Sequence, residues 1–504
     1  MRTALFLALG ATAWAASPVR EAVEARQPRI LSEFIEFLSI PNVASDTVNI
    51  QRNADHLRRM MEQRGIKTRI LEGGGKQPVV FGELTTPGSQ RTFVFYAHYD
   101  GQPVENSEWA GGDPFQPRLL SASLEKDGKL IPLPVTADRI DPEWRLYGRS
   151  TSDDKAGIMA MLSALDALKD RNIPLTSNLK FVFEGEEEAG SNHLAGALKA
   201  NAADLSADVW FICDGPVHQT RRQQVYFGAR GVVGYNLTVF GPRRELHSGH
   251  YGNWAPNPAM MLARLLASMK DDGGRVLIPG FYEGVAPFTP TEEKAVADAP
   301  DNDAELRQEL WLARTEGNGR KLIELINEPS LNIRGLRSVD VEAKSRNVIP
   351  ARATASIDIR LVKGISPQDA TDRLQRHIRK QGYYLSDHEP DESTRLTYPR
   401  IAMLTNSEGG YNAARTSMDL PVSKQVLAAL EKARGPVVAM PTLGGSVPLY
   451  MIEEILHVPF IGIPIANHDN SQHSFNENIR LQNLWDGIET MAALMTMPYS
   501  ADNR

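Results

Sequence analysis

An apolar run meets three consecutive carboxylates in the stretch Phe181-Val-Phe-Glu184-Gly-Glu186-Glu187-Glu188-Ala-Gly190-Ser191. The run over residues 179–183 predicts a short buried β-strand, and the acidic turn follows it directly. Like charges at this density repel one another, and they repel more strongly beside a low-dielectric sheet. A solvated acidic loop would tolerate the triplet, whereas bound metal ions would neutralise it. The choice between these interpretations depends on whether the rest of the chain supplies further metal ligands.

The composition is that of an ordinary globular protein. The chain has 504 residues, 42% hydrophobic and 23% charged, so it is long enough for two or three domains. The net charge is −7 and no basic block occurs. Nucleic acid is therefore not expected as the main partner, because phosphate binding needs clustered Lys and Arg. The single cysteine, Cys213, excludes an intrachain disulfide framework and any multi-cysteine zinc site.

The amino terminus has the pattern of a secretory signal peptide. Arg2 supplies a positive charge, residues 4–13 form a short apolar run, and Ala13-Trp14-Ala15 offers a cleavage site. Neither this run nor any other is long and apolar enough to predict a membrane span. We therefore predict that residues 1–17 are a cleaved signal peptide and that the protein is secreted to a bacterial-type periplasm, which its near lack of cysteine also suits. The alternative is a disordered start to a cytoplasmic protein.

Strand patterns alternate with helical patterns through residues 18–228, and the alternation resumes in residues 405–504. This order predicts an α/β domain with a mostly parallel sheet that helices cover on both faces. Residues 229–404 contain two strand-and-helix units, which predict a smaller inserted α+β domain. Residues 101–144 and 271–335 give no clear pattern.

Side chains of ligand type stand where the predicted strands end. His98 and Asp100 follow one strand, Asp214 follows another, the glutamate triplet follows a third, and Asp153 precedes a helix. One such residue alone is more often structural or a helix cap. Because parallel strands bring their carboxyl ends to one edge of a sheet, four clusters together predict a shared site, and zinc favours these ligand types. The H-x-D spacing places His98 and Asp100 on one face of an extended segment, so we expect Asp100 to orient the His98 ring.

Six motifs in order make the chain resemble one metallopeptidase family. They are Tyr96-Ala-His98-Tyr-Asp100, Gly148-Arg-x-x-x-Asp153-Asp-Lys155, Glu186-Glu-Glu188-x-Gly-Ser191, Leu246-His247-Ser248-Gly249, Asn347-Val-Ile-Pro350 and Gly444-Gly-Ser446. This is the di-zinc family of carnosinase-type dipeptidases, carboxypeptidase G, aminoacylase and succinyl-diaminopimelate desuccinylase. The likeness runs from about Ile30 to the C-terminal helix, and the segment from Trp109 to Phe115 favours the carnosinase-like branch.

The resemblance implies two zinc ions per subunit and a specific set of ligands. The ligands are His98 and Asp214 on one ion, Glu188 and His473 on the other, and Asp153 as the bridge between them. The late histidine is assigned from Gln472-His-Ser-x-Asn476-Glu477, and His468 is its competitor. Cobalt or manganese suits the same ligands.

The resemblance also assigns the proton transfer to Glu187. This residue takes the place of the general base, which accepts a proton from the metal-bridging water and passes it to the leaving amine. Asp100 is implied as the partner of His98. Glu186 adds an acid where many family members have a neutral residue, which would raise the pKa of the base.

The inserted domain carries family signals of its own. His247 resembles the histidine that reaches into the partner subunit's active site to stabilise the oxyanion. The resemblance therefore implies a homodimer, with residues 229–404 as a lid and dimerisation domain. Arg360 resembles the anchor for a substrate carboxylate, a task suited to its planar fork of donors. Asn347 and Ser446 match substrate-contacting positions, with turn and capping roles as the alternative.

Two further departures from the family pattern remove no metal ligand. Ser150 replaces the usual glycine of a Gly-Arg-Gly turn, and this small change should fit. Leu443 stands where close dipeptidase relatives have a glutamate before Gly-Gly-Ser, which leaves the substrate contacts there open.

These implications favour a di-zinc hydrolase that cleaves the amide bond of dipeptides or short peptides with a free C-terminal carboxylate. An N-acyl-amino-acid amidohydrolase is the alternative, with the same metals and base but another acyl pocket, whose contacts fall in residues 101–144 and 271–335. A non-catalytic binding protein on the same fold is a third interpretation, and it predicts a broken ligand set.

Overall fold

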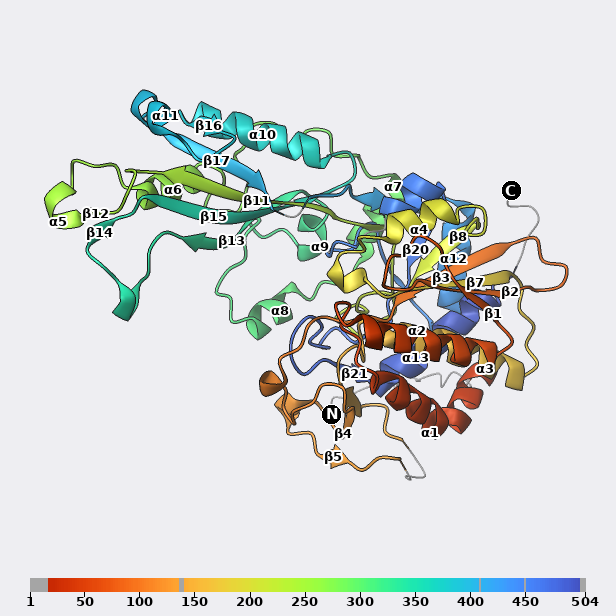
Figure 1. Cartoon of the computed structure of the whole chain (residues 1–504). Coiled ribbons are helices and arrows are strands. Elements are labelled where there is room, and N and C mark those ends of the chain that lie inside the picture. The colour runs from red at the N-terminus through yellow and green to blue at the C-terminus, as the bar shows by residue number, and fades with distance from the viewer. Residues whose placement is uncertain (1–16, 136–139, 408, 448–449, 499–504) are drawn as a thin grey trace, which may run out of the picture.

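The computed structural model describes residues 17–135, 140–407, 409–447 and 450–498 (Figure 1). The first element is α1 (Pro18–Leu38), and Ser17 caps it by accepting a hydrogen bond from the backbone N–H of Arg20 at 3.1 Å. All of the predicted signal peptide except Ser17 lies outside the described residues, so its cleavage stays a prediction. Among the described helices, none combines the length and apolar character that a bilayer crossing requires.

An eight-stranded sheet forms the larger part of the molecule, in the order β1–β2–β7–β3–β8–β20–β9–β19. Its strands are β1 (Lys67–Ile70), β2 (Val80–Leu84), β3 (Thr92–His98), β7 (Asn178–Glu184), β8 (Val209–Ile212), β9 (Gln224–Tyr226), β19 (Val438–Met440) and β20 (Phe460–Gly462). The central neighbours β7, β3, β8 and β20 run parallel, as the alternation of strands and helices predicts.

Towards the edges of this sheet, the expectation of parallel pairing needs a correction. β1 pairs antiparallel with β2, β2 pairs antiparallel with β7, and β20 meets β9 antiparallel. Parallel neighbours need a crossover connection, whereas β1 and β2 follow one another without an intervening helix and can only turn back on themselves. The sheet is therefore parallel at its centre and mixed towards its edges.

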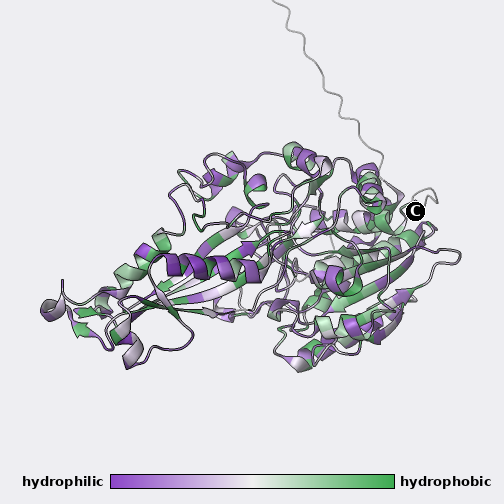
Figure 2. Ribbon diagram, turned by 90° about the horizontal axis from the view of Figure 1, so that it is seen from above, coloured by the Kyte–Doolittle hydropathy of each residue, from purple (hydrophilic) through white to green (hydrophobic). Residues whose placement is uncertain are grey.

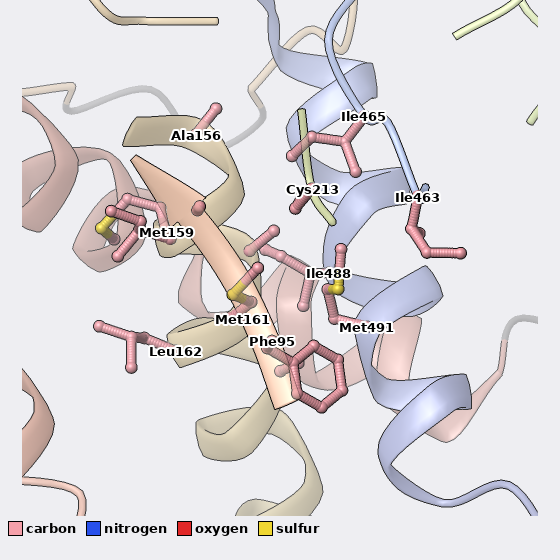
Figure 3. Packing of buried hydrophobic residues seen from close by; sticks show 14 of the residues in the cluster. Phe95, Ala156, Met159, Met161, Leu162, Cys213, Ile463, Ile465, Ile488 and Met491 are labelled. Carbon is pink, nitrogen blue, oxygen red and sulfur yellow. The ribbon is translucent and has the colours of Figure 1, made fainter. Parts of the chain in front are cut away.

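Helices cover both faces of the large sheet, as predicted. On one face, Phe93 and Phe95 of β3 belong to a core with α1, α2 (Thr47–Glu62), α3 (Lys155–Asp170), α12 (Pro421–Arg434) and α13 (Leu481–Met495). On the other face, Val94 and Tyr96 pack in a second core with α4 (Leu194–Ala200). Figure 3 shows Met161 of α3 and Met491 of α13 gathered around Phe95. Successive strand residues point to opposite faces, so a strand covered on both sides must be apolar throughout.

A five-stranded sheet, β13–β15–β11–β17–β16, forms the smaller part. Its strands are β11 (Gly231–Phe240), β13 (Ser330–Arg337), β15 (Arg352–Leu361), β16 (Tyr384–Ser386) and β17 (Ile401–Asn406). Helices α6 (Pro258–Ala267) and α10 (Pro367–Lys380) pack on it. Figures 1 and 2 show this sheet extending away from the larger part, with α5 (Ser248–Tyr251), β12 (Leu246–His247) and β14 (Val348–Ile349) at its far end. The predicted domain bounds at 229 and 404 fall close to the ends of this sheet and stay a prediction.

The two regions without a clear pattern fold into small elements. Residues 101–144 contribute β4 (Arg118–Leu120) and β5 (Leu130–Ile131), which form a four-stranded sheet with β6 (Arg145–Tyr147) and β21 (Asn478–Arg480). The remaining short elements are α7 (Pro290–Asp298), α8 (Asp303–Glu309), α9 (Leu322–Leu325), α11 (Glu392–Thr397) and the pair β10 (Gly228–Ala229) and β18 (Ala414–Arg415).

Candidate metal centre

The predicted ligands converge at the carboxyl edge of the four parallel strands. His98 is the last residue of β3, Asp214 follows β8, and Glu188 follows β7. Asp153 lies two residues before the start of α3, and His473 lies on the loop between β20 and β21. Because neighbouring parallel strands end at the same edge, residues far apart in the chain are brought to one place.

Asp153 lies between two groups of ligand atoms. The Nε2 atom of His98 is 2.9 Å from Oδ1 of Asp153, and Nε2 of His473 is 3.1 Å from its Oδ2. His473 Nε2 is also 3.3 Å from Oε2 of Glu188. Two sets each offer ligand atoms within 4.8 Å of one another, namely His98, Asp153 and Asp214, and Asp153, Glu188 and His473. These are the groupings that the resemblance implies, and His468 belongs to neither.

Asp100 connects His98 to the turn that carries the glutamates. Its Oδ1 lies 3.4 Å from Nδ1 of His98, which is also 3.2 Å from the Asp100 carbonyl oxygen. The Asp100 carboxylate accepts hydrogen bonds from the backbone N–H groups of Glu187 and Glu188, each at 3.0 Å. Asp100 therefore lies against His98 as predicted, and it also holds the acidic turn in place, which the sequence did not indicate.

Burial and mutual repulsion act on the carboxylates of the centre. Burial and the charge of Asp153 raise the pKa of Glu188 to about 7 and that of Asp214 to about 6. Burial raises the pKa of Glu187 well above its usual range, and the nearby Asp214 and Glu188 add to the rise. Burial alone would also raise the pKa of Asp153, but hydrogen bonds from two histidines outweigh burial and lower it.

The donor set fits divalent cations. Imidazole nitrogen and carboxylate oxygen are the ligands of catalytic zinc sites, which keep a position open for water. Each of the two sets supplies three side chains, and the raised pKa values of Glu188 and Asp214 reflect negative charge that cations would relieve. The residues present can therefore hold two metal ions that share Asp153, while the identity and number of the ions stay predictions.

Glu186, the first glutamate of the triplet, has a structural role. Its Oε2 accepts a hydrogen bond from the backbone N–H of His193 at 3.1 Å and lies 2.8 Å from Nδ1 of the same residue. His193 directly precedes α4, so Glu186 secures the start of that helix. The rise in the pKa of Glu187 comes chiefly from burial, Asp214 and Glu188. The raised pKa of Glu187 is therefore explained without the expected contribution from Glu186.

A pocket of about 870 Å³ adjoins the ligand groups, and its wall includes Asp153, Glu188, Asp214 and His473. Arg360 and Ser446 line the same pocket, and Nη1 of Arg360 donates a hydrogen bond to Oγ of Ser446 at 2.7 Å. Of the two regions without a clear pattern, residues 300–326 contribute to the wall, whereas the described part of residues 101–144 contributes none of it. Arg360 comes from β15, so the pocket lies between the two sheets.

Two predicted site residues lie away from this pocket. His247 ends β12, at the far end of the smaller sheet, and its side chain is exposed. Asn347 lies beside it, since the Asn347 carbonyl accepts a hydrogen bond from the Ser248 N–H at 2.9 Å. Neither residue lines the pocket of its own chain.

Sequence reasoning missed two side chains at the site. Tyr411 lines the pocket with Arg360 and Ser446, and its burial and the neighbouring Glu187 raise its pKa to about 12. No local pattern signals this residue. Glu477 is buried next to the candidate metal centre. The one sequence feature that could have pointed to it is the motif Gln472-His-Ser-x-Asn476-Glu477, which also contains His473.

Curated relatives cover most of this chain. A Cys-Gly metallodipeptidase of Schizosaccharomyces pombe is 26% identical over 487 residues, which cover 93% of this chain and 95% of the relative. The Beta-Ala-His dipeptidase of Homo sapiens is 28% identical over 425 residues, covering 82% of this chain and 76% of the relative.

Solved structures show the same fold. An M20 family metallo-carboxypeptidase from Sulfolobus solfataricus superposes with a TM-score of 0.74 at 27% identity, covering 93% of this chain and 98% of that one. Human carnosine dipeptidase 1 has a TM-score of 0.74 at 23% identity over 95% of this chain and 98% of that chain, a likeness of fold. The family description that matches residues 94–497 is Peptidase family M20/M25/M40. The chain therefore belongs to this family, and the metallopeptidase that its motifs predict is confirmed.

Proposed function

We propose that this protein is a secreted di-zinc dipeptidase. Its substrates are dipeptides or short peptides with a free C-terminal carboxylate, whose amide bond it cleaves. The observation that carries the proposal is that Asp153 belongs to both of two sets of three donors. In the proposed centre, the residues around one zinc ion are His98, Asp153 and Asp214, and those around the other are Asp153, Glu188 and His473. Cobalt or manganese ions suit the same donors.

Glu187 is the proposed general base. When bound, the two zinc ions lower the pKa of the attacking water and stabilise the developing oxyanion. Glu187 takes the proton of that water and delivers it to the nitrogen of the leaving amine. Asp100 supports this role, because its hydrogen bond from the Glu187 N–H at 3.0 Å fixes the turn on which the base stands.

Arg360 and Ser446 are the proposed anchor for the substrate carboxylate. They share the pocket with the metal ligands, and their hydrogen bond aligns the Arg360 guanidinium. A planar guanidinium binds a carboxylate with two parallel hydrogen bonds, which selects substrates that end in a free acid. Relatives named for Cys-Gly and Beta-Ala-His dipeptides favour dipeptide substrates. N-acyl amino acids also end in a free carboxylate and stay the second candidate.

Comparing the variants Glu187→Gln and Glu188→Gln distinguishes the proposed general base from a proposed metal ligand. Glu187→Gln should lower kcat by roughly 10²- to 10⁴-fold and keep two zinc ions per chain, because only proton transfer is lost. Glu188→Gln should lose zinc. Metal analysis and turnover of one dipeptide check both, with Glu186→Gln as the matched active control. If Glu187→Gln remained active, the base assignment would be wrong.

A substrate panel separates the two candidate activities. Dipeptides should turn over faster than N-acetyl amino acids, and C-terminal amides should lose roughly 10- to 100-fold in kcat/KM, because a hydrogen bond to a charged group is absent. Arg360→Ala should raise KM for free acids and abolish the discrimination against amides. Turnover of acylated substrates alone would establish the amidohydrolase instead. A protein without bound metal and without turnover of either class would be the non-catalytic binding protein.

A homodimer with composite sites is part of the proposal. His247 belongs to β12, which Figure 1 shows at the far end of the smaller sheet, and both His247 and the neighbouring Asn347 lie outside the pocket of their own chain. Apolar side chains are exposed on the same part of the molecule, including Trp254 at 78% and Leu336 at 63%. An apolar surface that is exposed in one chain is stabilised when a partner covers it. We propose that a second copy covers them, so that His247 and Asn347 complete the pocket of the partner.

Mixing two inactive variants tests this arrangement. His247→Ala and Glu187→Gln should each be inactive alone, because each lacks one part of every site. A mixed dimer should contain one intact site, so equal mixing and random exchange should restore about a quarter of the parent activity. Turnover after subunit exchange and sedimentation of the parent protein check the prediction. A monomeric parent, or a mixture without recovered activity, would contradict it.

Secretion is the remaining part of the proposal and rests on the pattern of residues 1–17. A cleavage between Ala15 and Pro18 would leave the whole of α1 (Pro18–Leu38) in the mature chain. Expression in a bacterium should give periplasmic protein whose N-terminal residue lies between Ala16 and Pro18. N-terminal sequencing of the periplasmic fraction checks this, and deletion of residues 2–15 should retain the protein in the cytoplasm. Uncleaved protein in the cytoplasm would contradict the prediction.

A further inference from the structure

The carboxylate of Glu477 accepts five hydrogen bonds beneath the metal centre, and its residue is 0% exposed. Its Oε1 accepts from the backbone N–H groups of Ser152 at 2.9 Å and Asp153 at 3.0 Å, and from Oγ of Ser152 at 2.9 Å. Its Oε2 accepts from the Ser150 N–H and from Nη1 of Arg149, both at 2.9 Å. One buried side chain thus accepts from three backbone N–H groups and two side-chain donors of the turn that ends in Asp153.

The same residue fixes the loop that carries His473. The backbone carbonyl of Glu477 accepts from the Gly148 N–H at 3.1 Å, and Arg149 donates through Nη2 to the carbonyl of Ser474 at 3.0 Å. Beyond Glu477, β21 pairs antiparallel with β6. Glu477 and Arg149 therefore tie the segment before Asp153 to the segment after His473.

Part of residues 101–144 packs against the ion pair of Arg149 and Glu477. The Arg149 guanidinium lies over the Trp109 ring at 5.2 Å from its centroid, and Trp109 is buried. The backbone N–H of Ala110 donates to Oδ1 of Asn476, next to Glu477, at 2.8 Å. The described part of residues 101–144 contributes nothing to the pocket wall, yet it covers Arg149, and the ion pair of Arg149 and Glu477 is buried away from water.

We propose that Glu477 is a positioning residue that sets the separation of Asp153 and His473, and through them the affinity of the zinc pair. The inference rests on the proposed di-zinc function. Asp153, which is common to both donor sets, donates its backbone N–H to Glu477, so a change in Glu477 would move a group shared by both proposed zinc sites. Residues that orient metal ligands typically change metal affinity by 10- to 100-fold when replaced.

Glu477→Gln tests the proposal with almost no change in volume. A glutamine amide has one acceptor oxygen and presents an N–H group to donors that need an acceptor. The variant should bind zinc about 10- to 100-fold more weakly in competition with a chromophoric chelator. Its cobalt-substituted form should show an altered visible spectrum. Activity should return as zinc is raised, with KM unchanged, because Arg360 and Ser446, the proposed anchor for the substrate carboxylate, are unaltered.

Glu292→Gln is the matched control. Glu292 is also a buried glutamate, 2% exposed, with Arg415 as its ionic partner at 3.5 Å, and it lies outside the pocket wall. The Glu292→Gln variant should keep the zinc affinity of the parent, even if it lowers the melting temperature of the metal-free protein. Parent-like affinity in Glu477→Gln, or an equal loss in both variants, would overturn the proposal.

Ser152→Ala replaces Glu477→Gln as the test variant if Glu477→Gln does not fold. It removes a single hydrogen-bond donor to the Glu477 carboxylate. A smaller but measurable fall in zinc affinity supports the proposal, and unchanged affinity overturns it. The zinc titration also separates this inference from the proposed function. A parent that binds no zinc refutes both, whereas a parent with two tightly bound ions and an equally tight Glu477→Gln variant refutes the positioning role alone.

Discussion

The crowding of carboxylates at one edge of the large sheet is the constraint on which the rest of the structure depends. Asp153, Glu188 and Asp214 offer ligand atoms within 4.8 Å of a neighbour, and burial raises the pKa of two of them to about 7 and about 6. A pair of unit charges 4 Å apart repels by about 4 kcal/mol at an effective dielectric constant of 20. A fold that holds several carboxylates this close together has to supply positive charge beside them. It also needs a rigid scaffold that keeps them in place against their repulsion.

The scaffold meets this need by burying both faces of its central strands and by ending them in polar turns. Those turns are irregular backbone next to a core, so their N–H groups need acceptors within the protein. Two buried carboxylates provide them. Asp100 accepts from the N–H groups of Glu187 and Glu188, and Glu477 accepts from those around Asp153. Acidic side chains thus have two separate uses here, as ligands on the surface of the site and as anchors for the backbone behind it.

The convergence of candidate ligands could be predicted because the ends of parallel strands lie together at one edge of a sheet and several strands are followed by a polar residue, whereas the full set with His473 was implied by the family resemblance. The preference for His473 over His468 came from the neighbouring residues of the motif and stays a prediction; of these two histidines, His473 is the one grouped with Asp153 in the described part of the chain. The antiparallel edges could not be predicted, because pairing partners depend on contacts between distant segments. The same holds for residues 101–144, whose place depends on Trp109 packing under Arg149, and for Tyr411, which no periodic pattern marks.

The division of the pocket between two sheets has a consequence for substrate length. The metal ligands stand on the eight-stranded sheet and its loops, whereas Arg360 stands on β15 of the five-stranded sheet. If Arg360 receives the carboxylate as proposed, the distance from anchor to scissile bond is set by how the two sheets pack. Ser446 connects the two parts at this point, because it follows β19 of the larger sheet and accepts a hydrogen bond from Arg360 at 2.7 Å. A site with its anchor on one sheet and its metal ligands on the other accepts only substrates of matching length. This selection suits an enzyme that cleaves the bond one residue from a free carboxylate.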